Sequence, residues 1–235
     1  MPKIITSNGV IRYKTHVLYC GVKYIDKEIA FENLKLFKKI LSKNNIKFQL
    51  AYGTLLGAVR EYDFISHDED IDLVILEEEK QHTFDILPQL IAEGFEIARY
   101  DRRGLLSIIR KGEYIDLYFM KSDGNGIRSC SGILVIEKFL TQTTKINFKG
   151  EEFDAPKDYK GFLECEYGKS WSTPIEWHDF NMPKWRRWMF YLKEHLKDAL
   201  PDSLYFRLAS KSEKKLEAKC RKQIDKYLSD GGTLY

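Results

Sequence analysis

The chain has 235 residues, of which 43% are hydrophobic and 31% charged, so it can bury a core and is not a disordered chain. The formal net charge of +3 gives no general argument for nucleic-acid binding, and we expect no nucleic-acid partner. The four cysteines are widely spaced without a C-x-x-C pair, which argues against a zinc site or a disulfide framework. Neither a signal peptide nor a membrane-spanning run is apparent, so we expect a cytoplasmic protein, with peripheral contact to the inner face of the membrane as an open alternative.

Hydrophobic spacing predicts a helix, then a mixed set of strands with an inserted helix, then a helical end. In chain order the elements are a helix at 26–45, a strand at 48–53, a helix at 54–61, a strand at 71–78, a helix at 79–94, strands at 95–101, 105–112, 114–121, 132–139 and 145–156, and helices at 157–168, 183–200 and 211–228. Pro88 is expected to kink or divide its helix. This order predicts an α+β fold, in which helices flank a mixed β-sheet.

The C-terminal part differs in composition from the rest. From Asn181 onwards it carries 13 Lys and Arg against 7 Asp and Glu, which fits either a solvated helical face or contact with an anionic partner or membrane surface. A cluster of aromatic residues spans the beginning of this part: Tyr167, Trp171, Trp177, Phe180, Trp185 and Trp188. Such rings could cage a quaternary ammonium group such as choline, pack as an aromatic core, or lie at a membrane interface. We expect a catalytic core over residues 1–175 and a basic, aromatic-rich helical extension over 176–235.

The acidic stretch that enters the strand at 71–78 is the strongest functional signal. Side chains alternate along a strand, so Asp70 and Asp72 point to one face while the apolar residues between them reach the core. Asp116 is flanked by Ile115 and Leu117 in another apolar strand. If the sheet aligns these strands, three carboxylates gather on one face, and a hard divalent cation such as Mg²⁺ (or Mn²⁺) would relieve their repulsion. A solvated acidic loop is the alternative.

The residues before this strand favour a metal site over a solvated acidic loop. Gly53 ends a predicted strand and Thr54 opens a helix, an arrangement that aims backbone N–H groups at an anion such as a phosphate. Arg60 is a candidate for contact with a donor phosphate, and His67 for contact with substrate. Together these groups suit phosphoryl transfer through metal ions, in which Asp116 bridges the reacting metal or takes the proton of the acceptor hydroxyl.

The stretch "YGTLLGAVREYDFISHDEDIDLVI" resembles the LicD family, which includes fukutin and fukutin-related protein, within the DNA polymerase β-like nucleotidyltransferase superfamily. A second stretch, "INFKGEEFDAPKDYKGFLECEYGKSWSTP", resembles the family's later motif, with Phe148, Gly150, Tyr167-Gly168 and Trp171 at matching positions. The resemblance implies a nucleotidyltransferase fold, Asp70 and Asp72 as the metal pair, Asp116 as the later carboxylate, and Gly53 and Thr54 as the donor-phosphate turn. The family's usual Gly, Pro and Trp before the acidic residues are replaced here by other residues.

The resemblance implies a transferase that moves phosphocholine or a polyol phosphate from a CDP-linked donor to a hydroxyl of a glycan or lipid-linked glycan acceptor, with CMP leaving. Two alternatives remain open. The first is a nucleotidyltransferase that attaches a nucleoside monophosphate to a small acceptor. The second is a non-catalytic binding module that keeps the fold.

Overall fold

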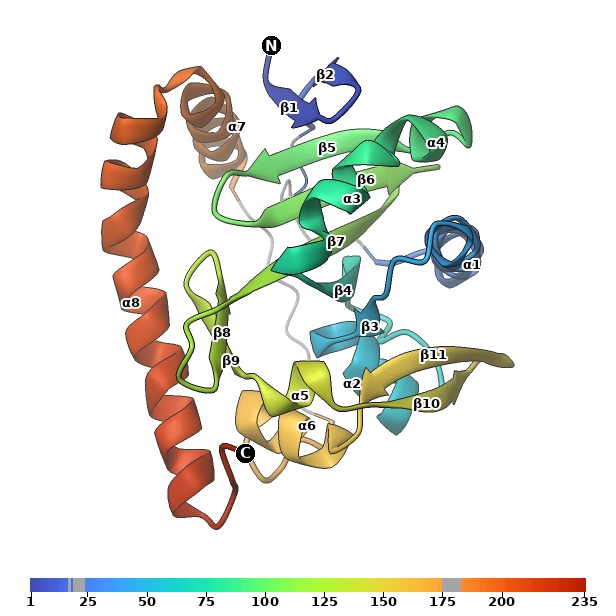
Figure 1. Cartoon of the computed structure of the whole chain (residues 1–235), viewed down its shortest axis with the longest axis vertical. Helices are drawn as coiled ribbons and strands as arrows, with labels where there is room; N and C mark the ends of the chain where they lie inside the picture. Colours follow the sequence, from blue (N-terminus) through green and yellow to red (C-terminus); the bar gives the residue numbers. More distant parts are fainter. Residues whose placement is uncertain (17, 19–23, 175–182) are drawn as a thin grey trace.

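The structure is a computed structural model that describes residues 1–16, 18, 24–174 and 183–235 (Figure 1). Its strands are β1 (Lys3–Thr6), β2 (Gly9–Arg12), β3 (Gln49–Leu50), β4 (Asp70–Leu76), β5 (Glu96–Asp101), β6 (Leu105–Arg110), β7 (Glu113–Ser122), β8 (Ile127–Cys130), β9 (Ile133–Ile136), β10 (Thr143–Phe148) and β11 (Glu151–Pro156). Its helices are α1 (Lys27–Lys43), α2 (Tyr52–Arg60), α3 (Lys80–Asp85), α4 (Leu87–Ala92), α5 (Lys138–Thr141), α6 (Tyr159–Tyr167), α7 (Lys184–Ala199) and α8 (Asp202–Ser229), with a short 3-10 helix at Glu77–Glu79.

A mixed sheet of seven strands organises the molecule, which confirms the predicted α+β class. Five strands follow the order β3-β4-β7-β6-β5, and β8 and β9 continue from the end of β7. The pairing of β4 with β7 is parallel, whereas the other pairings within this sheet are antiparallel. Because β4 and β7 are direct neighbours, the two acidic segments singled out in the sequence lie side by side.

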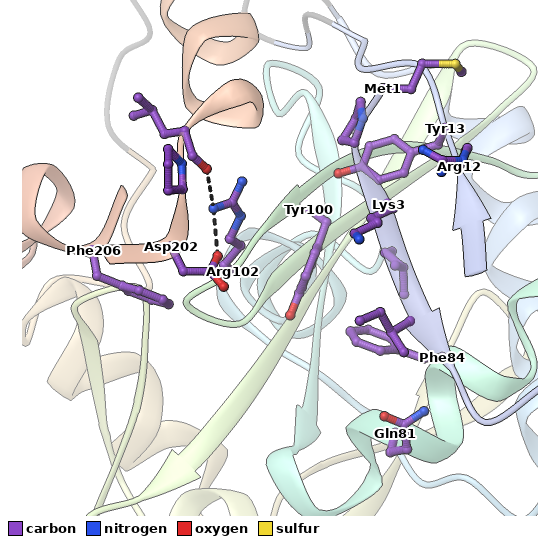
Figure 2. Close-up of a pocket in the computed structure, with 15 residues that line it drawn as sticks. Met1, Lys3, Arg12, Tyr13, Gln81, Phe84, Tyr100, Arg102, Asp202 and Phe206 are labelled. Atoms are coloured by element: carbon purple, nitrogen blue, oxygen red, sulfur yellow. Dashed lines mark hydrogen bonds and ion pairs between the residues drawn. The ribbon is translucent and has the colours of Figure 1, made fainter. Parts of the chain in front are cut away.

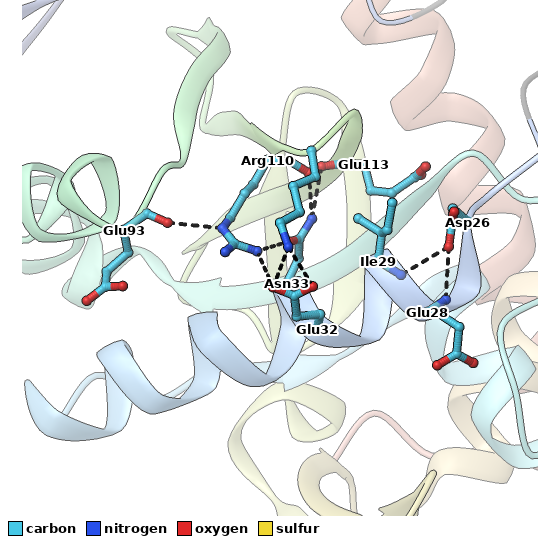
Figure 3. A network of polar contacts seen from close by, with 9 residues as sticks. Asp26, Glu28, Ile29, Glu32, Asn33, Glu93, Arg110 and Glu113 are labelled. Carbon is cyan, nitrogen blue, oxygen red and sulfur yellow. Dashed lines mark hydrogen bonds and ion pairs between the residues drawn. The ribbon is translucent and has the colours of Figure 1, made fainter.

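Helix α1 covers the sheet through an apolar stripe that includes Leu34, Phe37 and Leu41, all of which are fully buried. Asp26 caps the helix by accepting hydrogen bonds from the N–H groups of Glu28 and Ile29. Figure 3 shows how the same helix is fixed to the β6–β7 turn. There the Glu32 carboxylate accepts hydrogen bonds from Arg110 and Lys111, which hold its pKa down at about 2.

The long helix α8 runs along one side of the molecule and packs against β9 and α6 (Figure 1). Its buried contacts come from Tyr205 near its start and from Cys220, Ile224 and Tyr227 in its second half. Among the described residues, no helix combines the length and the apolar character needed to cross a bilayer.

The structure departs from the sequence-based prediction in several places. Strand β8 was not predicted, the strand expected at 132–139 ends at Ile136 and is followed by α5, and the strand expected at 145–156 is the two strands β10 and β11. The N-terminal hairpin β1–β2 was not predicted. The strand expected at 48–53 is only two residues long, because α2 begins at Tyr52 and takes Gly53 into its first turn. Helix α8 begins nine residues before the predicted residue 211. The expected interruption near Pro88 is confirmed, since α3 ends at Asp85 and α4 begins at Leu87.

Candidate active site

Three predicted carboxylates lie on one face of the sheet. In the parallel ladder of β4 and β7, Asp72 and Asp116 are direct partners. Partners in a parallel ladder point to the same face, and Asp70 shares that face because it precedes Asp72 by two residues. Asp72 and Asp116 are both buried, whereas Asp70 is half-buried. The local pattern therefore comes from strand alternation, and the meeting of the two strands comes from the tertiary fold.

A fourth carboxylate joins them. One ligand oxygen from each of Asp68, Asp70 and Asp72 lies within 4.8 Å of the others. The prediction named Asp70 and Asp72 as metal ligands together with Asp116, but the compact group contains Asp68 in the third place. The missed signal was simple, since residues 68, 70 and 72 continue one alternation beyond the start of the strand.

The electrostatics of this group favour a cation. Burial raises the pKa of Asp70 well above its ordinary value, and the charges of Asp72, Asp116 and Asp68 raise it further. Burial, Asp68 and Asp116 act in the same way on the pKa of Asp72. The pKa of Asp68 is also raised, mainly by burial. Oxygen donors that repel one another when ionised are a fitting ligand set for a hard divalent cation.

Asp116 is held differently. Its carboxylate accepts hydrogen bonds from the Arg99 Nη2 atom at 3.1 and 3.4 Å and from the Ser107 hydroxyl. Arg99 also donates to the Ser107 hydroxyl, through Nε at 3.2 Å and Nη2 at 3.0 Å. Burial raises the pKa of Asp116, while Arg99 and Ser107 lower it.

The ladder registers explain this arrangement. Asp72, Asp116, Ser107 and Arg99 are successive partners across β4, β7, β6 and β5, so they form one polar row over four strands. A register shift in β5 just before Arg99 sets its position in that row. Sequence reasoning missed Arg99 and Ser107, because neither carries a local motif and only the pairing of the strands brings them to Asp116.

The start of α2 is fixed to the acidic strand. The Gly53 N–H donates to Asp72 Oδ2 at 3.0 Å, and the Thr54 hydroxyl accepts a hydrogen bond from the Asp72 N–H at 2.9 Å. A Cβ atom at Gly53 would collide with the Asp68 carboxylate, so a larger residue would displace that side chain from the acidic group. Thr54 is fully buried. In this structure both residues that were predicted to bind a donor phosphate contact Asp72.

The acidic face opens into a cleft of about 650 Å³ between α2, β4, α6 and the second half of α8. Arg60, His67, Asp68, Asp70 and Asp72 all line it, so the structure brings these predicted residues together. Arg60 donates to the backbone oxygen of Trp171 at 3.3 Å and pairs with Glu61 at 2.7 Å. Gly53 also lines the cleft, whereas the lining does not include Thr54 or Asp116.

Aromatic rings also form much of the cleft wall. The cleft is lined by Tyr52, Tyr118, Tyr167 and Trp171. The Tyr118 hydroxyl donates to Asp72 Oδ1 at 3.1 Å, and its ring meets that of Tyr52 edge-on with centroids 5.1 Å apart. The structure thus places Tyr167 and Trp171 of the predicted aromatic cluster at the cleft.

The other members of that aromatic cluster lie elsewhere. Trp185 and Trp188 are exposed on α7, which rules out a packed aromatic core for these two side chains. Trp177 and Phe180 fall outside the described residues. The aromatic rings of the cleft therefore come from α2, β7 and the segment 167–171, and Trp185 and Trp188 form a separate exposed surface on α7.

Helices α6 and α8 close the cleft with a mixture of charges. Glu166 lies at the end of α6, and burial raises its pKa to about 7. Lys219 and Gln223 of α8 face the same space, and Gln223 donates to the backbone oxygen of Glu166 at 2.7 Å. The cleft therefore combines an acidic group suited to a metal ion, several aromatic rings, and a basic residue contributed by α8.

Comparison with known proteins agrees with this geometry. The family model described as "LicD/FKTN/FKRP, nucleotidyltransferase domain" matches residues 45–158, which contain the acidic row and α2. An uncharacterized protein of Rickettsia prowazekii (strain Madrid E) is 30% identical over 186 residues, covering 79% of this chain and 63% of the relative. An uncharacterized protein of Rickettsia typhi (strain ATCC VR-144 / Wilmington) is 42% identical over 67 residues, 28% of this chain and 22% of that protein. The chain thus spans less than two thirds of the length of these relatives.

Solved structures show a more distant likeness. The lincomycin-bound lincosamide antibiotic adenylyltransferase LnuA superposes with a TM-score of 0.41 at 11% identity, covering 72% of this chain and 97% of that chain. The solution structure of the antibiotic-resistance factor ANT(2'')-Ia gives a TM-score of 0.45 at 11% identity, covering 87% and 97%. Residues 45–158, which contain the acidic row and α2, therefore match the nucleotidyltransferase domain of the LicD/FKTN/FKRP family.

Proposed function

We propose that the chain transfers a substituted phosphate from a CDP-linked donor to a hydroxyl of a glycan or lipid-linked glycan acceptor, with CMP as the leaving product. The observation that carries this proposal is the group of Asp68, Asp70 and Asp72, whose oxygens lie within 4.8 Å of one another on the wall of a cleft of about 650 Å³. A cleft of this size accommodates a nucleotide-sized ligand.

Asp68, Asp70 and Asp72 would hold Mg²⁺ or Mn²⁺, which when bound would neutralise charge on the phosphoryl oxygens and make the acceptor hydroxyl more acidic. Gly53 and Tyr118 orient the Asp72 carboxylate through their hydrogen bonds to its two oxygens. This leaves Asp72 fixed in position before any ligand arrives, which is the preorganisation that transfer chemistry needs.

Asp116 lies beside this group and would accept the proton of the acceptor hydroxyl or complete the metal ligand set. In this structure its oxygens accept three hydrogen bonds, from Arg99 and Ser107, so these two residues would hold the carboxylate in position for either role. Arg60 and His67, which line the same cleft, are proposed to contact the donor and the substrate respectively.

The aromatic wall supports choline as the donor headgroup, with a polyol as the alternative. Tyr52, Tyr118, Tyr167 and Trp171 offer ring faces, and a quaternary ammonium is attracted to such faces by the cation–π interaction. Glu166, when ionised, would add a negative charge to this side of the cleft. We expect Trp171→Ala to raise KM for CDP-choline by about tenfold, since a cation–π contact contributes roughly 1–2 kcal/mol in a desolvated site, and to change KM for CDP-ribitol less.

Nucleotidyl transfer is the second candidate, and it is supported by the family description, which names a nucleotidyltransferase domain. The two reactions differ in which side of the pyrophosphate moves. Incubation with CDP-choline or CTP, with a glycan acceptor and Mg²⁺, separates them. Release of CMP from CDP-choline supports the proposal, whereas release of pyrophosphate from CTP with no CMP would establish nucleotidyl transfer.

A non-catalytic binding module is tested by the double variant Asp70→Asn/Asp72→Asn. Unchanged metal affinity in that variant would favour the binding module. We further propose that residues 1–175 are the catalytic core and that 176–235 form an extension, of which α8 contributes Lys219 to the cleft. Removal of residues 176–235 is therefore expected to impair the cleft as well as the extension.

A further inference from the structure

Three segments that are distant in sequence expose apolar side chains at one end of the molecule. Figure 1 shows the β1–β2 hairpin, α7 and the beginning of α8 together at the top of the view. We call this end the hairpin–α7 surface and define it by Ile5 and Val10 of the hairpin, Trp185 and Trp188 of α7, and Leu208 of α8. These five large hydrophobic side chains are all more than half exposed.

The hairpin contributes one pair of basic residues and one pair of aliphatic residues. Lys3 lies opposite Arg12, and Ile5 lies opposite Val10. Lys3 and Ile5 alternate with buried residues, so both cations and both aliphatic side chains share the exposed face of the hairpin, where Lys3, Ile5 and Arg12 also line the cavity described below. Neither Lys3 nor Arg12 forms an ion pair with another residue in the part of the chain that the structure describes.

Helix α7 contributes an apolar stripe. Trp185, Trp188, Met189, Leu192 and Leu196 are all exposed, and their spacing of three and four residues puts them on one side of the helix. The sequence of α7 also carries five Lys and Arg against two acidic residues. An exposed stripe of Trp and Leu on a basic helix is the pattern of helices that lie in the plane of a membrane interface.

A cavity of about 700 Å³ lies between the hairpin, α3, β5 and the α7–α8 junction (Figure 2). Its lining includes Lys3, Arg12 and Arg102 together with the rings of Tyr13, Tyr100 and Phe206. Arg102 donates to the backbone oxygen of Leu200 at 2.9 Å and to Asp202 at 2.8 Å, so it also fixes the junction of the two helices. Asp202 offsets one of the three basic side chains, and the cavity keeps a positive balance.

We propose that the hairpin–α7 surface docks on a bilayer that contains anionic phospholipids, with a lipid phosphate group in the basic cavity. The argument rests on charge complementarity and on the exposed apolar side chains of elements that lie at the same end of the molecule as the cations. Apolar side chains insert at the boundary between headgroups and acyl chains, and neighbouring basic residues are attracted to anionic lipid.

A second copy of the chain fits this surface less well. A two-fold axis through the hairpin would bring Lys3 and Arg12 of one molecule close to the same cations of the other. Juxtaposed like charges in an interface are unfavourable, and the residue that lies opposite Lys3 in the hairpin is Arg12 and not an acidic residue.

Docking of the hairpin–α7 surface would also set the distance of the cleft from the membrane. This step rests on the proposed function. Helix α8 lines the basic cavity with Phe206 and the active-site cleft with Lys219. A helix rises about 1.5 Å per residue, so the two places are roughly 20 Å apart along α8. Docking would therefore hold the cleft within roughly 20 Å of the docked cavity, in reach of the glycan part of a lipid-linked acceptor.

Vesicle flotation with the full chain tests this inference, without nucleotide or metal. We expect at least about tenfold tighter binding to phosphatidylcholine vesicles that contain phosphatidylglycerol than to phosphatidylcholine alone, and weaker binding as salt is added. Lys3→Glu/Arg12→Glu and Trp185→Ser/Trp188→Ser should each weaken binding to the anionic vesicles by about tenfold or more.

Matched substitutions at exposed residues elsewhere, Lys39→Glu and Tyr62→Ser, should change vesicle binding less than about twofold. Brominated lipids should quench the tryptophan fluorescence of the unmodified chain, a measurement that needs no variant. Equal binding to neutral and anionic vesicles, or no binding at all, would overturn the inference. So would a dimer in light scattering that Trp185→Ser/Trp188→Ser converts to a monomer, because a second copy would then cover the surface.

These outcomes are separate from those of the proposed reaction. Release of CMP with a water-soluble acceptor requires the cleft and not the hairpin–α7 surface, and vesicle binding requires the surface and not the cleft. Lack of CMP release with intact vesicle binding would refute the reaction alone.

Discussion

Substitution of Arg99 by Met would expose how strongly the polar row depends on one ion pair. Arg99 and Asp116 have side chains that are 13% and 1% exposed, and they are joined at 3.1 Å. Removing one partner of a buried pair costs about 3–5 kcal/mol, because the other charge stays buried without compensation. Since Ser107 still donates to Asp116 and Arg99 is partly exposed, we expect a loss of about 3 kcal/mol. At roughly 2–4 °C per kcal/mol, Tm should fall by about 6–12 °C.

Urea unfolding of the metal-free protein measures this loss. Its dependence on pH tests whether the unpaired charge of Asp116 causes it. Burial already raises the pKa of Asp116, and without Arg99 the pKa must rise further. The destabilisation of Arg99→Met should therefore be largest above neutral pH and shrink as falling pH protonates Asp116. The double variant Arg99→Met/Asp116→Asn should recover about 2 kcal/mol, because no unpaired charge remains. A loss below about 1 kcal/mol in the single variant, or strict additivity in the double variant, would refute this reasoning.

Three further substitutions test the geometry around the cleft. Asp70→Asn should make the metal-free protein more stable than wild type above neutral pH, because the raised pKa of Asp70 makes its charge destabilising there; the advantage should vanish near about pH 4 in thermal melts with EDTA. Thr54→Val should cost about 1–3 kcal/mol in urea unfolding, because the buried Asp72 N–H loses its acceptor, whereas Thr54→Ser should cost less. Gly57→Ala should destabilise by about 1–3 kcal/mol, since a Cβ there would lie 2.5 Å from the Asp63 backbone oxygen, and this outweighs the roughly 1 kcal/mol gained in helix propensity.

Each of these has a contrary result. Equal stability of Asp70→Asn and wild type at all pH values would mean that the acidic group is not strained without metal. An unchanged unfolding curve for Thr54→Val would mean that α2 is not held to β4 through this hydroxyl. A more stable Gly57→Ala variant would mean that the loop after α2 shifts to make room for the added Cβ atom.

The sequence predicted the parts of the site that depend on local pattern. Alternation in the acidic strand placed Asp70 and Asp72 on one face, and the apolar context of Asp116 marked a second strand of the same kind. The parallel pairing of β4 with β7 then put Asp72 opposite Asp116. Two short-range patterns sufficed because the two strands turned out to be direct neighbours in the sheet.

The parts that could not be predicted depend on pairing between distant strands. Arg99 and Ser107 reach Asp116 only through the registers of β5, β6 and β7, one of which contains a shift. We expected a phosphate-binding turn at Gly53 because the sequence pattern predicted that a strand ends there. In the structure Tyr52 begins the helix with a positive φ of 42°, and the Gly53 N–H is bonded to Asp72. No local pattern distinguishes these two conformations.

Metal binding tests the central claim most directly. Titration of the apo protein with Mn²⁺, followed by calorimetry and by the electron paramagnetic resonance of free Mn²⁺, should show a saturable site that releases protons, because the pKa values of Asp70 and Asp72 are raised. Saturation at 100 times the dissociation constant should stabilise the fold by about 2.7 kcal/mol. The account predicts that Asp70→Asn/Asp72→Asn abolishes this binding while Asp123→Asn, in an exposed turn, retains it. Binding that survives in the double variant would contradict the account.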